Sequence, residues 1–455
     1  MNGMTQASAG QAVRLADVVR PRPGNSKLIK GKLPSHPGPG LYPAFSASGQ
    51  DTYAPVAEHM GNAVVVSAVG ARCGKCFLAS GQWSAIANTH VLLPDESKID
   101  VRFLWYRVND ERFWTRGGSA QPFVRVRESL EREILLPPLK EQREIVAELE
   151  KQFSRLDEAV ANLKRVKANL KRCKAAILEA AVEGRLVPTE AEIACREGRS
   201  YETGSQLLGR VLQERRRAWN GRGTYRDPEA PGIGELPHLP EGWAWARLEA
   251  IAALKGGITV DKKRRDPTSR PVPYLRVANV QRGHLDLEEV KEIEAPEADI
   301  EELRLRSGDV LFNEGGDRDK LGRGWIWEGQ LPECIHQNHV FRARPYLADM
   351  SGKLISWWGN TFGKDYFLRE GKQTTNLASI NMTKLSAFPV PAPPPAEQRR
   401  IVAEVDRRLS IVREVEAEVD ANLKRAQALR QAVLARAFGR ALSVQQASSP
   451  ASCAA

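Results

Sequence analysis

The sequence predicts a mixed α/β protein in which two compact domains alternate with two long helices. Three observations carry this prediction. A segment that begins EQREIVAELE at residue 141 has a second copy that begins EQRRIVAEVD at residue 397, in the same order and without a gap. Short β-rich runs precede each copy, and Gly- and Pro-rich turns separate those runs. Self-similarity at a fixed offset indicates a duplicated architecture.

Both copies are predicted to be long helices that pair as a coiled coil. Apolar residues recur every seven positions, in the same phase in the two copies, which is the pattern of a pairing seam. At about 1.5 Å per residue, the shared span makes a rod of roughly 60 Å. The sequence leaves their orientation open, and it also allows two unrelated surface helices, each docked on its own domain. The predicted pairing residues are Leu149, Leu156, Leu163, Leu170 and Ile177 in the first helix and Val405, Val412, Val419, Ala426 and Val433 in the second.

The first half of the chain is expected to contain a disordered start, one domain and the first long helix. Residues 1–13 are mostly small and polar and are expected to be disordered. Residues 14–138 alternate β-rich runs with turn clusters, as in a compact α/β domain. Pro137 and Pro138 then open the first long helix, residues 139–186, which is expected to end near Gly184.

The second half restarts in the same way. Residues 187–238 hold two short helical patterns and a Gly- and Pro-rich stretch, which together are typical of a linker. WARLEAI at 245–251 is similar to VRLADVV at 13–19, and QNHV at 337–340 is similar to NTHV at 88–91. We therefore expect two related domains with different targets. The second half is divided into a domain at 239–392, a helix at 393–442 and a disordered tail at 443–455.

Bulk composition favours a soluble, cytoplasmic protein with a polyanionic partner. The chain has 455 residues, enough for two or three domains, and 67 Lys and Arg against 56 Asp and Glu give a net charge of +11. It has no apolar run of about 18 residues and no signal-peptide layout at its start, so no membrane role is expected. Its six Cys are few and scattered, which indicates reduced thiols.

These features together resemble the specificity subunit of type I restriction-modification systems. The resemblance rests on LLPPLKEQREIVAELE at 135–150, PAPPPAEQRRIVAEVD at 391–406, LPEGW at 239–243 and GDVLF at 308–312, and also on the helix endings AAVEGRL and ARAFGRAL. It covers the chain from about Arg14 to Leu442. One departure is that the first domain begins at VRL without the Trp-containing lead of the second, which leaves open whether the first domain is complete.

The resemblance implies a division of labour among several chains. Each domain would be a target recognition domain reading one half of a split sequence in double-stranded DNA. The paired helices would set the gap between half-sites and dock two methyltransferase (modification) subunits. Those subunits would use S-adenosylmethionine, and restriction/translocase subunits would use ATP and magnesium. This chain would bind none of these cofactors.

Motifs for chemistry on this chain itself are missing or incomplete. An adenine methyltransferase needs an Asn/Asp-Pro-Pro-aromatic motif, and DPEA at 227–230 and DPTS at 266–269 lack its second half. GARCGKC at 70–76 is one residue too short for a phosphate-binding loop and ends in Cys instead of Ser or Thr. Cys73 and Cys76 have zinc-ligand spacing without a second ligand pair. We therefore expect neither a catalytic residue nor a metal site.

DNA contacts are expected on polar loops interrupted by Gly. Arg suits guanine edges, Asn and Gln suit adenine edges, and Lys and Arg bind phosphates. The alternative for each single residue is a solvated surface charge, and His90 and His339 fit a structural role as well as a base contact. In the first domain the candidates are Lys27, Lys30, Lys32, Tyr42, Ser46, Ser48, Arg72, Lys75, Asn88 and Gln121. In the second they are Lys262, Lys263, Arg264, Arg265, Arg276, Asn279, Lys320, Arg323, Asn338, Lys372, Gln373 and Asn376.

Two other functions remain open at this stage. The chain could be a coiled-coil scaffold that joins two protein-binding modules, and gel shifts with a modification subunit would separate that role from DNA recognition. It could also be the detached specificity half of a fused restriction-methyltransferase, which the neighbouring reading frames would show.

Overall fold

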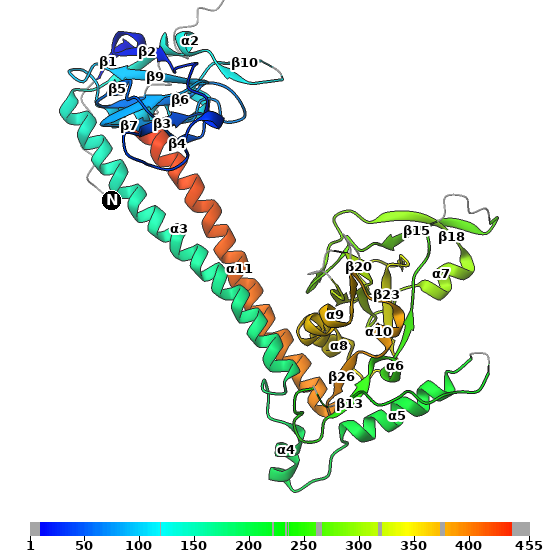
Figure 1. The fold of residues 1–455 in the computed structure, drawn as a ribbon. Helices are drawn as coiled ribbons and strands as arrows, with labels where there is room; N and C mark the ends of the chain where they lie inside the picture. The colour runs from blue at the N-terminus through cyan, green and yellow to red at the C-terminus, as the bar shows by residue number, and fades with distance from the viewer. Residues whose placement is uncertain are drawn as a thin grey trace, which may run out of the picture. The chain divides into compact units, whose positions relative to one another are not determined.

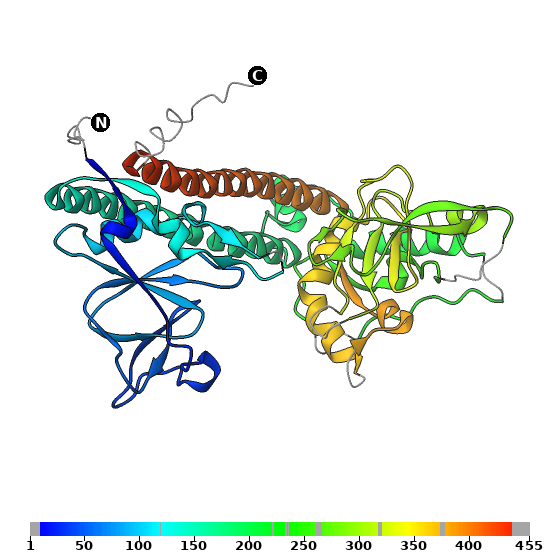
Figure 2. The same ribbon diagram turned by 90° about the horizontal axis from the view of Figure 1, so that it is seen from above.

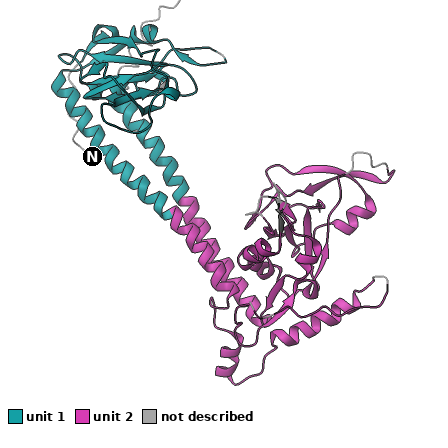
Figure 3. Cartoon of the chain, viewed as in Figure 1, with its two compact units in different colours: residues 1–166, 419–455 teal, residues 167–418 magenta. Residues whose placement is uncertain are grey.

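A computed structural model of the chain describes residues 10–118, 120–220, 223–232, 234, 236–260, 266–316, 321–373 and 378–438. It forms two compact units, one made of residues 1–166 and 419–455 and the other of residues 167–418 (Figure 3). Each unit holds one domain and a part of each long helix (Figure 1). The mixed α/β fold class is confirmed.

The domain of the first unit is built on two four-stranded sheets. The first has the order β2-β9-β6-β7, and the second has the order β4-β3-β8-β5 with β3 parallel to β8. All five residues of β6 are buried, which is why its sequence, AVVVS, is an unbroken apolar run before the final Ser. The strands are β2 (Val19–Pro23), β3 (Tyr42–Ser46), β4 (Gly49–Ala54), β5 (His59–Met60), β6 (Ala63–Ser67), β7 (Cys76–Ala79), β8 (Gln82–Ala85) and β9 (Thr89–Pro94).

Short elements complete this domain. The helix α1 packs on β6 and β7. Its N-cap is Asp100, whose carboxylate accepts hydrogen bonds from the backbone N–H groups of Arg102 and Phe103. The strand β1 pairs with β12 in antiparallel register. The elements are β1 (Gln11–Arg14), α1 (Val101–Val108), β10 (Arg116–Gly117), β11 (Phe123–Val124), α2 (Val126–Leu130) and β12 (Glu133–Leu136), with 3-10 turns at Leu15–Asp17, Lys30–Lys32 and Glu111–Phe113.

The expected disorder of residues 11–13 is wrong. Gln11, Ala12 and Val13 belong to β1 and pair with Leu136, Leu135 and Ile134 of β12. The strand β13 (Ala244–Arg247) pairs in the same way with β26 (Pro389–Ala392) in the second domain. The first domain therefore opens with a strand equivalent to that of the second.

The domain of the second unit repeats the plan of the first. Its sheet β14-β23-β19-β21 corresponds to β2-β9-β6-β7, and its sheet β18-β15-β22 corresponds to β4-β3-β8, again with one parallel pair. The strands are β14 (Ala252–Lys255), β15 (Ser269–Leu275), β16 (Val280–Gln281), β17 (His284–Leu285), β18 (Lys291–Pro296), β19 (Val310–Asn313), β20 (Gly315–Gly316), β21 (Gly324–Ile326), β22 (Ile335–His336), β23 (Val340–Pro345), β24 (Lys372–Gln373) and β25 (Ala378–Ser379). The helices are α6 (Leu248–Ile251), α7 (Glu297–Leu303), α8 (Gly352–Asn360), α9 (Phe362–Glu370) and α10 (Met382–Ser386).

The segment between the halves contains the two short helices that the sequence indicated. They are α4 (Glu190–Glu197) and α5 (Gly204–Arg217), and each begins with a capping box, Thr189 with Glu192 and Thr203 with Gln206. The helix α5 packs on α6 and on β13 and β26. This part of the predicted linker is therefore a folded part of the second unit.

The long helices α3 (Leu139–Val182) and α11 (Pro395–Phe438) have the same length, 44 residues. In each unit they lie side by side (Figures 1 and 2). In the first unit Arg430 donates to Asp157 at 2.6 Å, and in the second Lys174 is paired with Glu416. Within each unit the chain runs in opposite directions along the two helices (Figure 1), so the pairing is antiparallel, which the sequence left open. Gly184, with φ of 70°, follows the end of α3.

The predicted seam residues differ in how deeply they are buried. Leu149, Ile177, Val405, Val412, Val419 and Ala426 are buried, whereas Leu156, Leu163, Leu170 and Val433 are partly exposed. In the second unit Ile177, Val405 and Val412 join the core of that unit's domain, together with Ile401. The helices therefore pack both on each other and on the domains.

The burial along α11 predicts opposite outcomes for two isoleucines. Ile401→Ala removes a fully buried side chain from the core of the second unit, and we expect a loss of about 2–5 kcal/mol in the free energy of unfolding. Ile411→Ala on the same helix removes a side chain that is 48% exposed and should change it by less than about 0.5 kcal/mol. Urea denaturation of the two variants and the parent chain checks this, and equal losses would contradict the packing described.

Candidate nucleic-acid interface

The candidate loops of the first domain are linked by backbone hydrogen bonds to one turn, residues 85–89. Asn25 N–H donates to the Ala85 carbonyl at 2.8 Å, and Ala87 N–H donates to Leu28 at 3.1 Å. Ala68 N–H donates to the Asn88 carbonyl at 2.9 Å, and Ile86 N–H donates to Phe45 at 3.0 Å. The loops that carry Lys27, Ser48, Arg72 and Asn88 are therefore tied to one end of the domain. Gln121 joins them, because Gly70 N–H donates to the neighbouring Pro122 carbonyl at 2.8 Å.

Most candidate side chains on these loops are available to a ligand. Lys27, Lys30, Lys32, Ser48, Arg72, Lys75, Asn88 and Gln121 are exposed, and Tyr42 is half-buried at the start of β3. Lys30 is paired with Asp51, and Lys75 lies over the ring of Phe77, 5.8 Å from its centroid. Such exposed pairs are weak and can be exchanged for phosphate contacts.

Ser46 is the exception in the first domain. Its side chain is only 3% exposed, and its hydroxyl oxygen accepts a hydrogen bond from Ser48 N–H at 3.0 Å. The expected DNA contact is therefore corrected to a structural role, because Ser46 shapes the turn that presents Ser48.

The described candidates of the second domain also meet at one end of its sheets. Asn338 N–H donates to the Ile258 carbonyl at 2.9 Å, and Gln337 N–H donates to Leu275, just before Arg276, also at 2.9 Å. Arg323 donates to the Val277 carbonyl at 3.2 Å. The half-buried Arg276, Arg323 and Asn338 are thus brought together by neighbouring loops.

Asn279 is corrected from a base-reading residue to a structural one. It is 3% exposed, its Oδ1 accepts from Arg276 N–H at 3.0 Å, and its Nδ2 donates to the Asp286 and Glu289 carbonyls, both at 2.9 Å. A buried side chain whose polar atoms are all bonded to the backbone has nothing left to offer a base edge.

We expect Asn279→Ala to lower the free energy of unfolding by about 1–3 kcal/mol, because it leaves buried backbone groups without partners. Gln121→Ala, on an exposed loop of the first domain, should leave stability within about 0.5 kcal/mol of the parent. Thermal and urea unfolding measure both. A stable Asn279→Ala protein with an altered DNA sequence preference would restore the original assignment.

Several predicted contacts cannot be placed on this interface. Lys262, Lys263, Arg264, Arg265, Lys320 and Asn376 lie outside the described residues. Lys372 and Gln373 form β24, whose backbone pairs with β25, and their side chains are likewise not described. The predictions for these residues stand as predictions.

The two equivalent histidines differ in environment. His90, on β9, is half-buried, and burial lowers its pKa, so it is neutral at pH 7. His339 is exposed and lies 2.5 Å from Glu314 through Nδ1. His339 is the better placed of the two to face a ligand.

Other sites in the described residues have structural explanations. Cys73 and Cys76 are buried in the first domain, where burial raises the pKa of the Cys76 thiol and its Sγ donates to the Val108 carbonyl. Among the described residues there is no group of three or more His, Cys, Asp or Glu that could hold a metal ion. Within the same residues no helix is long and apolar enough to cross a membrane.

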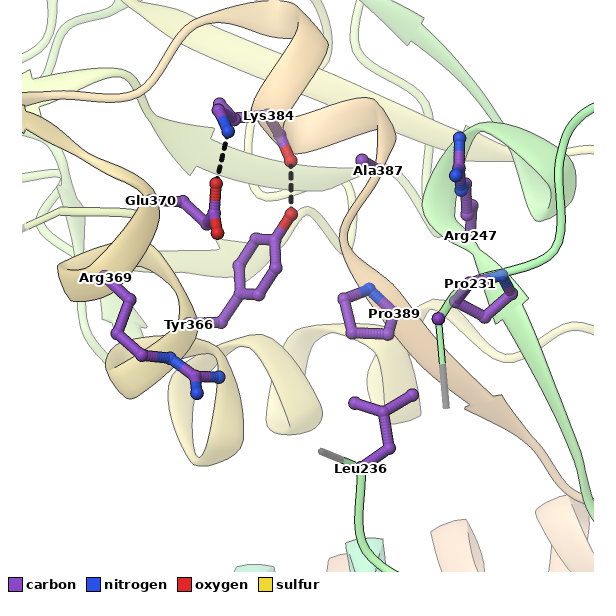
Figure 4. A pocket seen from close by; sticks show the side chains of 10 residues that line it. Pro231, Leu236, Arg247, Tyr366, Arg369, Glu370, Lys384, Ala387 and Pro389 are labelled. Carbon is purple, nitrogen blue, oxygen red and sulfur yellow. Dashed lines mark hydrogen bonds and ion pairs between the residues drawn. The ribbon is translucent and has the colours of Figure 1, made fainter. Parts of the chain in front are cut away.

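A pocket of about 340 Å³ lies where the linker crosses the second domain (Figure 4). Glu370 is paired with Lys384, and the Tyr366 hydroxyl donates to the Lys384 carbonyl at 3.0 Å. Arg247 donates to Glu229 of the linker at 2.7 Å. Because these polar groups pair with residues of the same unit, the pocket is explained by the docking of the linker.

Sequence reasoning missed two residues that the structure singles out, Gln142 and Gln398. They are almost fully buried at the starts of α3 and α11, at equivalent places in the two copies. The available signal is the repeated EQR, which by itself indicates only the duplication.

Comparisons with known proteins agree with this architecture. Residues 12–172 match the family model "Type I restriction modification DNA specificity domain". The EcoDI specificity subunit of Escherichia coli is 23% identical over 444 residues, covering 92% of this chain and 87% of that protein. A protein of Methanocaldococcus jannaschii named as a MjaX specificity subunit is 26% identical over 170 residues, covering 37% of this chain and 39% of its own length.

A solved structure shares the fold over nearly the whole chain. The HsdS subunit from Thermoanaerobacter tengcongensis matches with a TM-score of 0.52 and 19% identity, covering 94% of this chain and 96% of that one. At this identity the likeness concerns the fold alone. Taken with the family model over residues 12–172 and the relatives, which match on the sequence, it leads to one conclusion: the chain is similar to the DNA specificity subunits of type I restriction-modification systems.

Proposed function

We propose that this chain is the DNA-reading subunit of a type I complex, and that each of its domains reads one half of a bipartite site. The observation that carries the proposal is the duplication itself. Two domains with the same strand order, at the starts of two helices of 44 residues, carry different side chains on equivalent loops. Recognition of one continuous site would not require two separate domains of this kind.

The loops that carry the described candidate residues would supply the chemistry for reading DNA, and we call them the reading loops. They lie around residues 27–32, 48, 72–75, 88 and 121 in the first domain and around residues 276, 323 and 338 in the second. Exposed Lys and Arg can bind phosphates and hold the register, while Asn88, Gln121 and Asn338 can exchange hydrogen bonds with base edges. The net charge of +11 favours association with a polyanion.

The long helices would set the gap between half-sites and dock two methyltransferase subunits. Both remain helical for 44 residues although much of their surface is exposed and charged, which suits elements that bind further chains. Methyl transfer from S-adenosylmethionine, and cleavage driven by ATP with magnesium, would be performed by partner subunits. The part of this chain would be to bind and orient DNA, without a catalytic residue of its own.

A binding selection tests this proposal. The full chain, assembled with its methyltransferase subunits, is mixed with a pool of random DNA duplexes, and the retained duplexes are separated by gel shift and sequenced. The expected result is a motif of two short defined sequences separated by a fixed number of base pairs. A continuous motif, or retention without any sequence preference, would contradict the proposal and favour a scaffold.

A further inference from the structure

Each domain is attached to its long helix by a buried glutamine. In the first unit Gln142 of α3 accepts a hydrogen bond through Oε1 from Asp100 N–H at 2.8 Å. Its Nε2 donates to the carbonyls of Lys98 and Pro137 at 2.9 and 2.8 Å. Asp100 is the N-cap of α1, so Gln142 joins the start of the long helix to the start of the domain helix.

The second unit repeats this arrangement with Gln398 of α11. Its Oε1 accepts from Ser351 N–H at 2.8 Å, and its Nε2 donates to the Pro393 carbonyl at 2.8 Å. Ser351 is the N-cap of α8, the helix that corresponds to α1. The two glutamines are 0% and 2% exposed. Both ends therefore use the same atoms for the same purpose.

An ion pair adds a second attachment point, and it too is duplicated. Arg102, two residues after the N-cap of α1, donates to both oxygens of Glu150 at 3.0 and 3.1 Å. Lys353, two residues after the N-cap of α8, donates to Asp406 at 2.8 Å. Glu150 and Asp406 are equivalent in the two helix copies, although the residue types differ. The geometry has been kept where the side chains have changed.

We propose that these contacts are helix clamps, which fix the angle of each recognition domain on its long helix and thereby the gap that the chain accepts between half-sites. The first clamp is Gln142 with Arg102 and Glu150, and the second is Gln398 with Lys353 and Asp406. This inference rests on the proposed function. Their members are positioning residues, because they lie between the long helices and the domain helices α1 and α8 and not on the reading loops.

Two attachment points fix an angle where one would not. Gln142 and Glu150 are eight residues apart on α3, which corresponds to about 12 Å along the helix axis. A domain held only near Gln142 could tilt about that point, and its reading loops would then move with it. The ion pair between Arg102 and Glu150, about 12 Å further along the helix axis, restricts that tilt.

The test measures tolerance for the gap in DNA. The full chain, assembled with its methyltransferase subunits, methylates duplexes that carry the recognised sequence with the native gap or with one base pair more or fewer. The variants are Gln142→Ala, Arg102→Glu and the double charge exchange Arg102→Glu with Glu150→Arg. Arg217→Ala is the matched control, because Arg217 pairs with Glu214 within the short helix α5 and lies on neither long helix. Thermal unfolding of each assembly shows whether the variants remain folded.

We expect Gln142→Ala and Arg102→Glu to reduce the preference for the native gap by ~10-fold, within the range that a misplacement of about 1 Å can produce. The sequences of both half-sites should stay the same, because the reading loops are unchanged. The charge exchange should restore the preference, and Arg217→Ala should match the parent. Arg102 is 58% exposed, so its variant is expected to fold even if Gln142→Ala does not.

Each other outcome is decisive. If the parent chain keeps a sharp gap preference and both clamp variants share it, the clamp inference is wrong and the proposed function stands. If the parent assembly shows no split sequence at all, the proposed function is wrong and the inference falls with it.

Discussion

Deleting one heptad from each long helix is expected to shorten the gap in the recognised sequence by about three base pairs. Seven residues span about 10.5 Å of helix, and one base pair of B-DNA occupies about 3.4 Å. The deletions are residues 163–169 of α3 and 419–425 of α11, which are equivalent in the two copies. A whole heptad keeps the seam in phase, so the helices can still pair.

The measurement is the methylated motif in DNA from cells that carry the shortened chain and its methyltransferase subunits. The sequences of the two half-sites should be unchanged while the gap between them decreases. A matched control deletes the heptad from α3 alone. This removes the partner of a heptad on α11, so pairing and methylation should be lost. An unchanged gap after the paired deletion would show that the helices do not set it.

Replacing Lys262, Lys263, Arg264 and Arg265 by Ala is expected to weaken DNA binding by the assembled complex and to flatten its salt dependence. Each phosphate contact contributes about 0.9 to the slope of log affinity against log salt. Loss of four such contacts would reduce the slope by up to about 3.6, because fewer counterions are released on binding.

Fluorescence anisotropy with a labelled duplex, over a series of salt concentrations, measures this slope. A control with the same change in charge replaces four exposed cations on short helices or helix ends away from the reading loops, namely Arg185, Arg196, Arg216 and Arg217. Its slope should equal that of the parent. If the loop variant also keeps the parent slope, these four residues do not contact phosphates.

The duplicated helices could be predicted from the sequence because their signal is local and periodic. A heptad repeat shows in the residues themselves, and the identical phase of Leu149 and Val405 marks the two copies as equivalent. The antiparallel orientation could not be predicted, because it depends on contacts between residues more than two hundred positions apart, such as Lys174 with Glu416.

The candidate DNA contacts were harder to predict, for a different reason. Composition distinguishes polar loops from buried strands, and it located the loops around Lys27, Arg72 and Asn88. It could not distinguish a side chain that faces solvent from one that bonds its own backbone. Asn279 and Ser46 were misassigned because Asn and Ser commonly hold turns as well as contact bases.

β1 was missed because its pairing partner is distant. Gln11–Arg14 is a short stretch without a clear apolar alternation, and it becomes a strand only through the register with Glu133–Leu136. Gln142 and Gln398 were overlooked as attachments because a glutamine in the first turn of a helix has no distinctive periodicity. Their roles depend on the N-caps of helices elsewhere in the fold.

The most direct test of two separate readers on one chain is single-molecule sequencing of modified adenines in cells with and without this protein, in the presence of its methyltransferase subunits. We expect one motif that depends on the protein and is made of two defined sequences separated by a fixed number of unspecified bases. An uninterrupted motif, or identical methylation in both cultures, would contradict it.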